Sequence, residues 1–203
     1  MKLIDDARAA GGLNLIVAHM DDEVLFAGGL ILRLLEEKIP LRLLCVVHPC
    51  YCNAWPAKDP REFTRIRART EAWRKVCEPD GIEDKVLTGD QWVYHVAESL
   101  ADWILAGRHF PIVTHGRAGE SGHRAHVALH HLVRSIATAE QLEEKVWVFS
   151  RASIRTIRYD REAKEALLAH YREGGHRTPV WDPRGNSIYK PWLEGQERFL
   201  ELT

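Results

Sequence analysis

The chain has 203 residues, of which 45% are hydrophobic and 28% are charged, and its formal net charge is -1 at pH 7. This length suffices for one well-buried domain and is short for two, so we expect a single domain over residues 1–203. The near-neutral charge argues against a protein that binds nucleic acid or an anionic membrane through bulk electrostatics. No apolar run approaches the roughly 20 residues of a membrane span, and the first residues lack the apolar core of a signal peptide.

Cysteine usage predicts a cytoplasmic protein. The four cysteines follow no regular framework, which is typical of free thiols in a reducing compartment; they are Cys45, Cys50, Cys52 and Cys77. A structural zinc site at Cys50 and Cys52 is disfavoured, because Cys-x-Cys lacks the Cys-x-x-Cys spacing and no second pair follows. We interpret their loop as one wall of a pocket.

Residues 13–18 form a short apolar run between two glycines and a group of acids, which is typical of a strand buried on both faces. An apolar helix over about residues 22–38 follows, and Asp21 or Asp22 can cap it. A capped helix explains one acid, but neither the second aspartate nor His19. Histidine and carboxylate on one tight turn can reach a single metal ion, and together they suit zinc or ferrous iron.

Gly28 and Gly29 lie inside this helix. Each glycine costs roughly 1 kcal/mol relative to alanine, so we interpret the pair as a place where the helix approaches a strand or a ligand closely. A dinucleotide is disfavoured as that ligand, because the G-x-G-x-x-G pattern is absent.

The alternation of strands and helices continues along the chain. Further strands are predicted over residues 41–48, 85–88, 111–115 and 145–149, with helices over residues 61–78, 95–107, 122–139, 161–172 and 192–202. This alternation predicts an α/β fold with a mainly parallel sheet covered on both faces. Right-handed crossovers favour an order in which the fourth strand lies beside the first, and ligands then bind where the loops after these two strands meet.

The loop after the fourth strand carries a second group of histidines. His123 and His126 fall three residues apart, on one side of the first turn of the following helix. The turn after the first strand lacks only a third metal ligand, and the topology predicts that this loop supplies it. We interpret His130 and His131 as part of a solvated helix face.

Two motifs, AHMDDEVLFAGG at residues 18–29 and GESGHRAH at residues 119–126, resemble the LmbE/PIG-L family of zinc-dependent N-deacetylases. The family signature is similar to AHPDDE near the start and GHPDH in the middle. The motifs and the strand-helix order between them cover roughly residues 13–150. The resemblance implies a Rossmann-like, three-layer LmbE fold with a mainly parallel sheet flanked by helices.

The resemblance also implies residue roles. A metal ion, Zn²⁺ or alternatively Fe²⁺, would be held by His19, Asp22 and His126. Asp21 would act as general base, taking a proton from water and delivering it to the departing nitrogen. His123, which we expect to be charged, would support the oxyanion or protonate the leaving amine. The implied substrate is a small-molecule N-acetylglucosamine conjugate that loses its acetyl group.

The sequence departs from the family pattern at four places. Met20 replaces the usual proline, Ser121 stands where many members have tyrosine, and the segment after the second strand lacks the usual Thr-Asn-Gly-rich turn. Arg124 and Ala125 replace the usual Pro-Asp between the histidines. Any carboxylate that orients a ligand histidine must therefore come from elsewhere.

Loops on the expected site face carry candidate substrate-binding residues. Trp92, together with Trp55 and Tyr94, would pack against a sugar ring. Asp90 is a candidate for binding a sugar hydroxyl, and Arg69 for binding an anionic aglycone.

Other functions remain as alternatives. Two histidines and one carboxylate also hold ferrous iron in oxygenases, but those enzymes are typically β-rich. A non-catalytic, metal-dependent module that binds carbohydrate or nucleotide is the main alternative, although a mere metal site would need neither Asp21 nor His123. A homo-oligomer also stays open.

Overall fold

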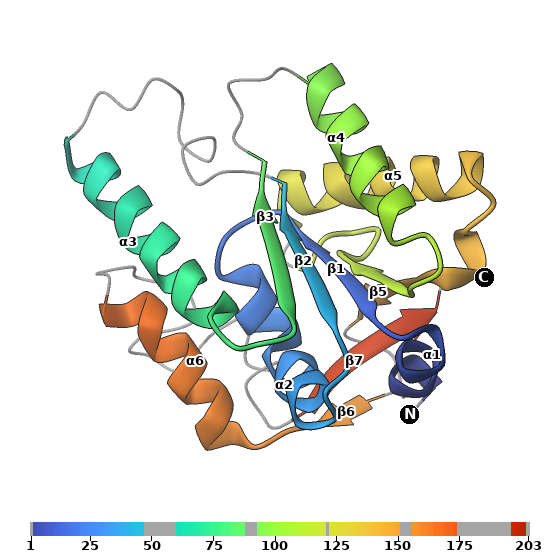
Figure 1. Ribbon diagram of the computed structural model, residues 1–203. Helices are drawn as coiled ribbons and strands as arrows, with labels where there is room; N and C mark the ends of the chain where they lie inside the picture. Colours follow the sequence, from blue (N-terminus) through green and yellow to red (C-terminus); the bar gives the residue numbers. More distant parts are fainter. Residues whose placement is uncertain are drawn as a thin grey trace.

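A single seven-stranded sheet organises the computed structural model, which describes residues 2–46, 60–87, 93–120, 122–150, 156–173 and 196–201 (Figure 1). The strand order is β3-β2-β1-β4-β5-β7-β6. The elements are α1 (Lys2–Ala10), β1 (Leu13–Val17), α2 (Asp22–Glu36), β2 (Leu41–Cys45), α3 (Pro60–Cys77), β3 (Ile82–Val86), α4 (Val93–Ala106), β4 (Ile112–Thr114), α5 (Arg124–Ala139), the 3-10 turn η2 (Glu143–Lys145), β5 (Val146–Phe149), β6 (Thr156–Arg158), α6 (Arg161–Glu173) and β7 (Gln196–Glu201).

The centre of the sheet matches the predicted topology. β1 is buried at every residue and pairs in parallel with β2 on one side and with β4 on the other. The strand order therefore reverses between β1 and β4. In open α/β sheets, this reversal opens a crevice beyond the carboxyl ends of the strands, and ligands bind there.

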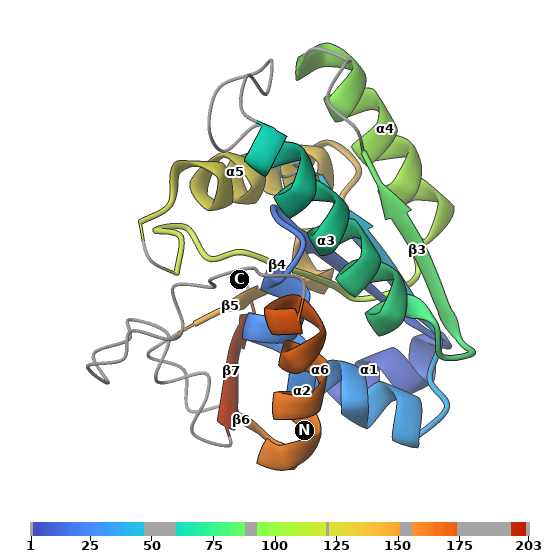
Figure 2. The ribbon, with the colours of Figure 1, turned by 90° about the vertical axis from the view of Figure 1, so that its left-hand side faces the viewer.

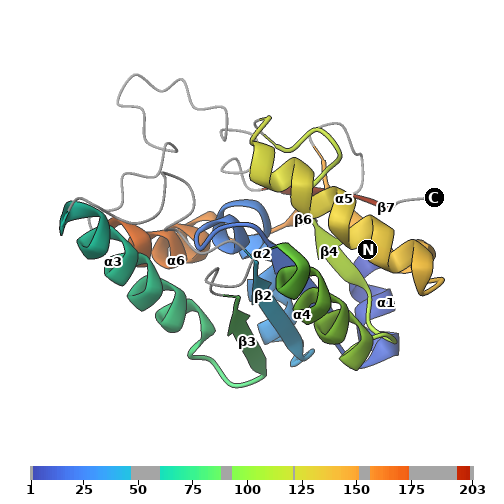
Figure 3. The same ribbon diagram turned by 90° about the horizontal axis from the view of Figure 1, so that it is seen from above.

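Helices cover both faces of the sheet, which gives three layers (Figures 1 and 3). One apolar core lies under α1, α2, α3 and α6, and its buried members include Leu3, Phe26, Trp73 and Tyr171. A second core lies under α4 and α5, with Leu100, Ile104, Leu129 and Val133. Within the described residues, no helix combines the length and the apolar character needed to cross a membrane.

Helix α2 is interrupted at Ala27, whose backbone is non-helical at φ -135° and ψ 16°. The carboxylate of Glu197, on β7, accepts hydrogen bonds from the N–H groups of Gly29 and Leu30 at 2.8 and 2.9 Å. Lys164, on α6, donates at 2.6 Å to Glu197 and at 2.9 Å to a carbonyl oxygen before the break. This buried ion pair satisfies the backbone groups that the interruption exposes.

A close approach is present at both glycines, as predicted, but side chains from elsewhere in the chain lie against them where a strand or a ligand was expected. A Cβ atom on Gly28 would lie 3.2 Å from Cγ of Lys164, and one on Gly29 would collide with the ring of Tyr159. These neighbours belong to α6 and to the residue after β6. The glycines therefore allow α2 to pack tightly against the C-terminal part of the chain.

The prediction of a helix over residues 192–202 is wrong. Residues Gln196–Glu201 form β7, which pairs antiparallel with both β5 and β6. Burial alternates along this strand, because Glu197 and Phe199 are buried whereas Leu200 is 47% exposed. That period of two is the strand pattern, and one buried charge at Glu197 concealed it in the sequence.

Candidate metal centre

The turn after β1 carries the first part of the site. Asp21 stands at the N-cap position of α2, but its side chain makes no cap hydrogen bond. The carboxylate of Asp22 folds back across the turn and accepts a hydrogen bond at 2.9 Å from the backbone N–H of His19. This bond holds the carboxylate of Asp22 beside the imidazole of His19, with 3.0 Å between Asp22 Oδ2 and His19 Nδ1.

The first turn of α5 brings His126 to the same place. Its Nε2 lies 3.1 Å from Nδ1 of His19 and 3.2 Å from Oδ2 of Asp22. Two ligand atoms on one tetrahedral zinc ion are about 3.3–3.4 Å apart, given bonds of 2.0–2.1 Å. All three side chains are buried. The three residues that the sequence singled out as metal ligands therefore form a triangle of the size that one metal ion requires.

Two further combinations of side chains place their donor atoms within 4.8 Å of one another. They are His19 with His123 and His126, and Asp22 with His115 and His126. In the second set, Nε2 of His115 accepts a hydrogen bond at 3.1 Å from the N–H of Ala18. This bond uses the lone pair that a metal ion would need.

Glu120 supplies the carboxylate that the sequence lacks between its two motif histidines. Its Oε2 accepts hydrogen bonds from Nδ1 of His126 at 2.8 Å and Nδ1 of His115 at 2.6 Å, and its Oε1 accepts from the N–H of Gly116 at 2.8 Å. Burial by itself would raise the pKa of Glu120, but the charge of His115 and the hydrogen bonds from His115 and His126 lower it to about 2. Burial by itself would lower the pKa of His126, but the carboxylates of Asp22 and Glu120 raise it to about 9. With Nδ1 of His126 donating to Glu120, Nε2 is the nitrogen that faces the triangle, and it offers a lone pair when the ring is neutral.

We expect Glu120→Gln to weaken metal binding by about 10- to 100-fold, because the variant loses the charge that orients His126. The measurement is the metal dissociation constant, obtained by competition with a chelator. Glu144→Gln is the control, since Glu144 is exposed in the turn before β5. Equal affinities for Glu120→Gln and the control would contradict the orienting role.

Asp21 adopts a backbone conformation that is rare outside glycine, at φ 125° and ψ -26°. Strain of this kind costs on the order of 1–3 kcal/mol and persists only where the surroundings enforce it. The carbonyl oxygen of Asp21 accepts a hydrogen bond from the N–H of Leu25 at 2.8 Å. The backbone N–H of Asp21 donates a hydrogen bond to Oε2 of Glu23 at 2.9 Å. Oδ2 of its carboxylate lies 3.7 Å from Nη2 of Arg69, on α3.

Glu23 is a buried acid whose partners no sequence pattern indicates. It is fully buried, and burial raises its pKa to about 8 although its hydrogen bonds favour the charged form. Tyr171, on α6, donates its hydroxyl hydrogen to Oε1 of Glu23. Burial also raises the pKa of Tyr171 well above its ordinary value, so the phenol keeps its proton.

His123 is the N-cap of α5, and its Nδ1 accepts a hydrogen bond from the N–H of Ala125 at 3.3 Å. Its ring centroid lies 4.7 Å from that of His19 and 4.9 Å from that of His126. His123 is exposed, yet partial desolvation lowers its pKa, and the neighbouring histidines lower it further. These surroundings favour a neutral ring whose proton sits on Nε2, in place of the charged ring expected from the sequence.

Comparison with known proteins identifies the family. A family model described as GlcNAc-PI de-N-acetylase (PIG-L) matches residues 14–137, well over half of the chain. The chain belongs to the PIG-L family. The match spans both motifs and the elements between them, and membership supports a deacetylase activity.

Solved structures of similar fold include two deacetylases. The N,N'-diacetylchitobiose deacetylase from Pyrococcus horikoshii is 14% identical at a TM-score of 0.69, covering 98% of this chain and 86% of that chain. A deacetylase triple mutant of the teicoplanin biosynthetic pathway is 13% identical at a TM-score of 0.62, and the match covers 89% of this chain and 88% of that chain. GalB, the 4-carboxy-2-hydroxymuconate hydratase from Pseudomonas putida KT2440, is 14% identical at a TM-score of 0.60, and the match covers 89% of this chain and 82% of that chain. These likenesses establish the fold, and a hydratase among them means that fold alone does not decide the reaction.

Other side chains singled out in this PIG-L chain fall in different places. The interpretation of His130 as solvated is wrong, because the ring is buried and its Nδ1 donates at 2.9 Å to the carbonyl oxygen of His115. Cys45 and Cys77 are buried, and neither forms a disulfide with another described residue. Three of the candidates for sugar binding, Trp55, Asp90 and Trp92, lie outside the described residues, and so does the loop of Cys50 and Cys52. The fourth candidate, Tyr94, lies in α4, but its side chain is not described.

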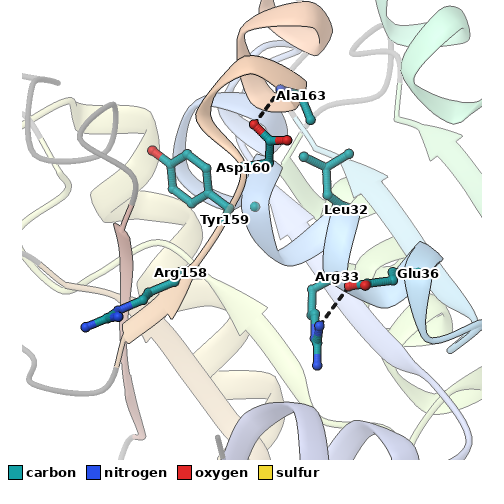
Figure 4. A pocket seen from close by; sticks show the side chains of 8 residues that line it. Leu32, Arg33, Glu36, Arg158, Tyr159, Asp160 and Ala163 are labelled. Atoms are coloured by element: carbon teal, nitrogen blue, oxygen red, sulfur yellow. Dashed lines mark hydrogen bonds and ion pairs between the residues drawn. The ribbon is translucent and has the colours of Figure 1, made fainter.

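A separate cavity of about 440 Å³ lies against the second half of α2 (Figure 4). Its polar lining includes Arg33, Glu36, Arg158 and Asp160. Arg33 pairs with Glu36 at 2.7 Å, and Asp160 accepts hydrogen bonds from the first turn of α6. None of its lining residues is a histidine or cysteine, so this cavity does not resemble the histidine site at the start of the helix.

Proposed function

We propose that the chain is a zinc-dependent N-deacetylase that removes an acetyl group from an N-acetylglucosamine-type conjugate. The observation that carries the proposal is the buried triangle of His19, Asp22 and His126 beside a second aspartate, Asp21. Membership of the PIG-L family supports the reaction class. We also infer that residues 1–203 act as one domain.

The triangle would hold the metal ion through Nδ1 of His19, Oδ2 of Asp22 and Nε2 of His126. A zinc ion bound there would lower the pKa of a water molecule and polarise an amide carbonyl. Ferrous iron suits the same donor set. Glu120 keeps His126 in the required tautomer, and burial of the triangle excludes bulk water from the ligand side.

Asp21 would take the proton of the attacking water and return it to the departing nitrogen. This role requires a carboxylate that lies next to the ligand Asp22 but outside the triangle. His123 would donate from Nε2 to the developing oxyanion as a neutral imidazole, because Nδ1 already accepts a backbone hydrogen bond. Arg69, beside Asp21, would bind an anionic group of the substrate.

The test is metal content of the purified protein, followed on the same sample by amine release from a panel of N-acetylglucosaminides. We expect stoichiometric zinc and measurable amine release from at least one of these compounds. Bound metal without turnover of any amide would instead favour the non-catalytic binding module. Absence of metal from the purified and zinc-supplemented protein would overturn the proposal.

Extending the panel defines the substrate. Asp90 and Trp92 remain proposals for contacts with the sugar, and Arg69 for contacts with an anionic aglycone. If Arg69 binds that group, Arg69→Ala raises KM for conjugates with an anionic aglycone and leaves KM for uncharged ones unchanged. An equal change for both kinds of conjugate would contradict that contact.

A further inference from the structure

The strained conformation of Asp21 depends on one acid from the same motif. Asp21 is buried, so its backbone N–H, at φ 125°, needs a hydrogen-bond acceptor within the protein. Oε2 of Glu23 supplies it at 2.9 Å. The acceptor therefore belongs to the first turn of α2, two residues further along the chain.

Tyr171 holds the other oxygen of the same carboxyl group. The hydroxyl of Tyr171 donates to Oε1 of Glu23, and both side chains are fully buried. Each oxygen of Glu23 thus accepts one hydrogen bond, one from the backbone of Asp21 and one from α6. The contact joins residues 148 positions apart in the sequence.

The helix that provides Tyr171 lies beyond residues 14–137, where the chain matches its family. α6 packs against α2 and α3 (Figure 2). The hydrogen bond to Glu23 places the buried Tyr171 beside the first turn of α2. A tyrosine that served packing alone would be replaceable by phenylalanine. The hydroxyl of Tyr171 is buried against Glu23, whose other carboxylate oxygen accepts the backbone N–H of Asp21. This connection gives the hydroxyl a role beyond packing.

We propose that Tyr171 and Glu23 are positioning residues that hold the proposed general base Asp21 in its active conformation. This inference rests on the proposed function, since it assigns the general base to Asp21. Neither residue touches the reacting atoms; Tyr171 acts through Glu23, and Glu23 acts through the N–H of Asp21.

The test compares Tyr171→Phe with Tyr159→Phe. Tyr159 is the matched control, because its ring packs on Gly29, in the second half of α2, and under the ammonium group of Lys164, on α6. For Tyr171→Phe we expect kcat to fall about tenfold, as for loss of one buried hydrogen bond, with KM and metal content unchanged. In an Asp21→Asn background, Tyr171→Phe should cause no further fall in kcat, because its effect passes through Asp21.

Hydrogen exchange of peptides that contain Asp21 provides a readout without substrate. We expect faster exchange at the motif in Tyr171→Phe and wild-type exchange in Tyr159→Phe. If the wild-type protein hydrolyses no amide, the proposed function fails, yet exchange still decides whether Tyr171 positions Asp21. Wild-type exchange and wild-type kcat in Tyr171→Phe, or equal losses in both variants, would overturn the inference.

Discussion

Asp21→Asn is expected to lower kcat for amine release by about 100- to 10,000-fold, the usual worth of a general base. Asparagine matches aspartate in size and tolerates positive φ, so the backbone at φ 125° should persist. The variant loses the ability to take up a proton and the negative charge beside Arg69. Because Asp21 lies outside the triangle of metal ligands, its metal content should equal that of the wild-type protein. Steady-state kinetics and metal analysis on one sample check both statements.

Asp80→Asn is the control for this experiment, since Asp80 is exposed in the turn before β3. It should match the wild-type protein in both kcat and metal content. If Asp21→Asn also loses its metal ion, Asp21 is a ligand and the assignment of base and ligand must be exchanged. If it keeps both metal and turnover, another group supplies the base.

Substitution of a single proposed metal ligand is expected to cause a large loss of metal affinity. His19→Ala and Asp22→Ala should each weaken metal binding by more than about 100-fold, beyond what loss of an orienting partner causes. His123→Ala should keep wild-type affinity, because His123 caps α5 and is not one of the three ligands in our assignment. Metal dissociation constants for the three variants provide the measurement.

The pattern of losses distinguishes the three possible donor sets. If His19, His123 and His126 held the metal, His123→Ala would lose it and Asp22→Ala would keep it. If Asp22, His115 and His126 held it, His19→Ala would keep it. Only our assignment requires loss in both His19→Ala and Asp22→Ala with retention in His123→Ala.

Much of the fold could be predicted from local patterns in the sequence. Short apolar runs between helical segments predict a parallel sheet, and the observed position of β1 between β2 and β4 is one of the few orders that right-handed crossovers favour. The same rule brought His19 and Asp22 together with His126, because parallel strands end at one edge of a sheet. These inferences succeed because spacing and chain order are properties of the sequence itself.

The missing carboxylate shows where such reasoning ends. The sequence shows that no acid stands between His123 and His126, so an orienting carboxylate has to come from elsewhere. It does not show that Glu120 provides it, because the loop from Gly116 must first fold back on itself. A signal was present, since Glu120 lies six residues before His126 in the same motif.

The contacts of the C-terminal part were decided by tertiary structure alone. A lone glutamate such as Glu197 normally indicates a solvated position, but Lys164 and the broken helix α2 stabilise it inside the protein. In the same way, the burial of Glu23 is explained only when the packing of α6, which places Tyr171 against its carboxyl group, is known. Periodicity along the chain determined which residues face the core and which loops meet at the site. Pairing between buried polar groups distant in sequence depends on how helices pack, and no local pattern records it.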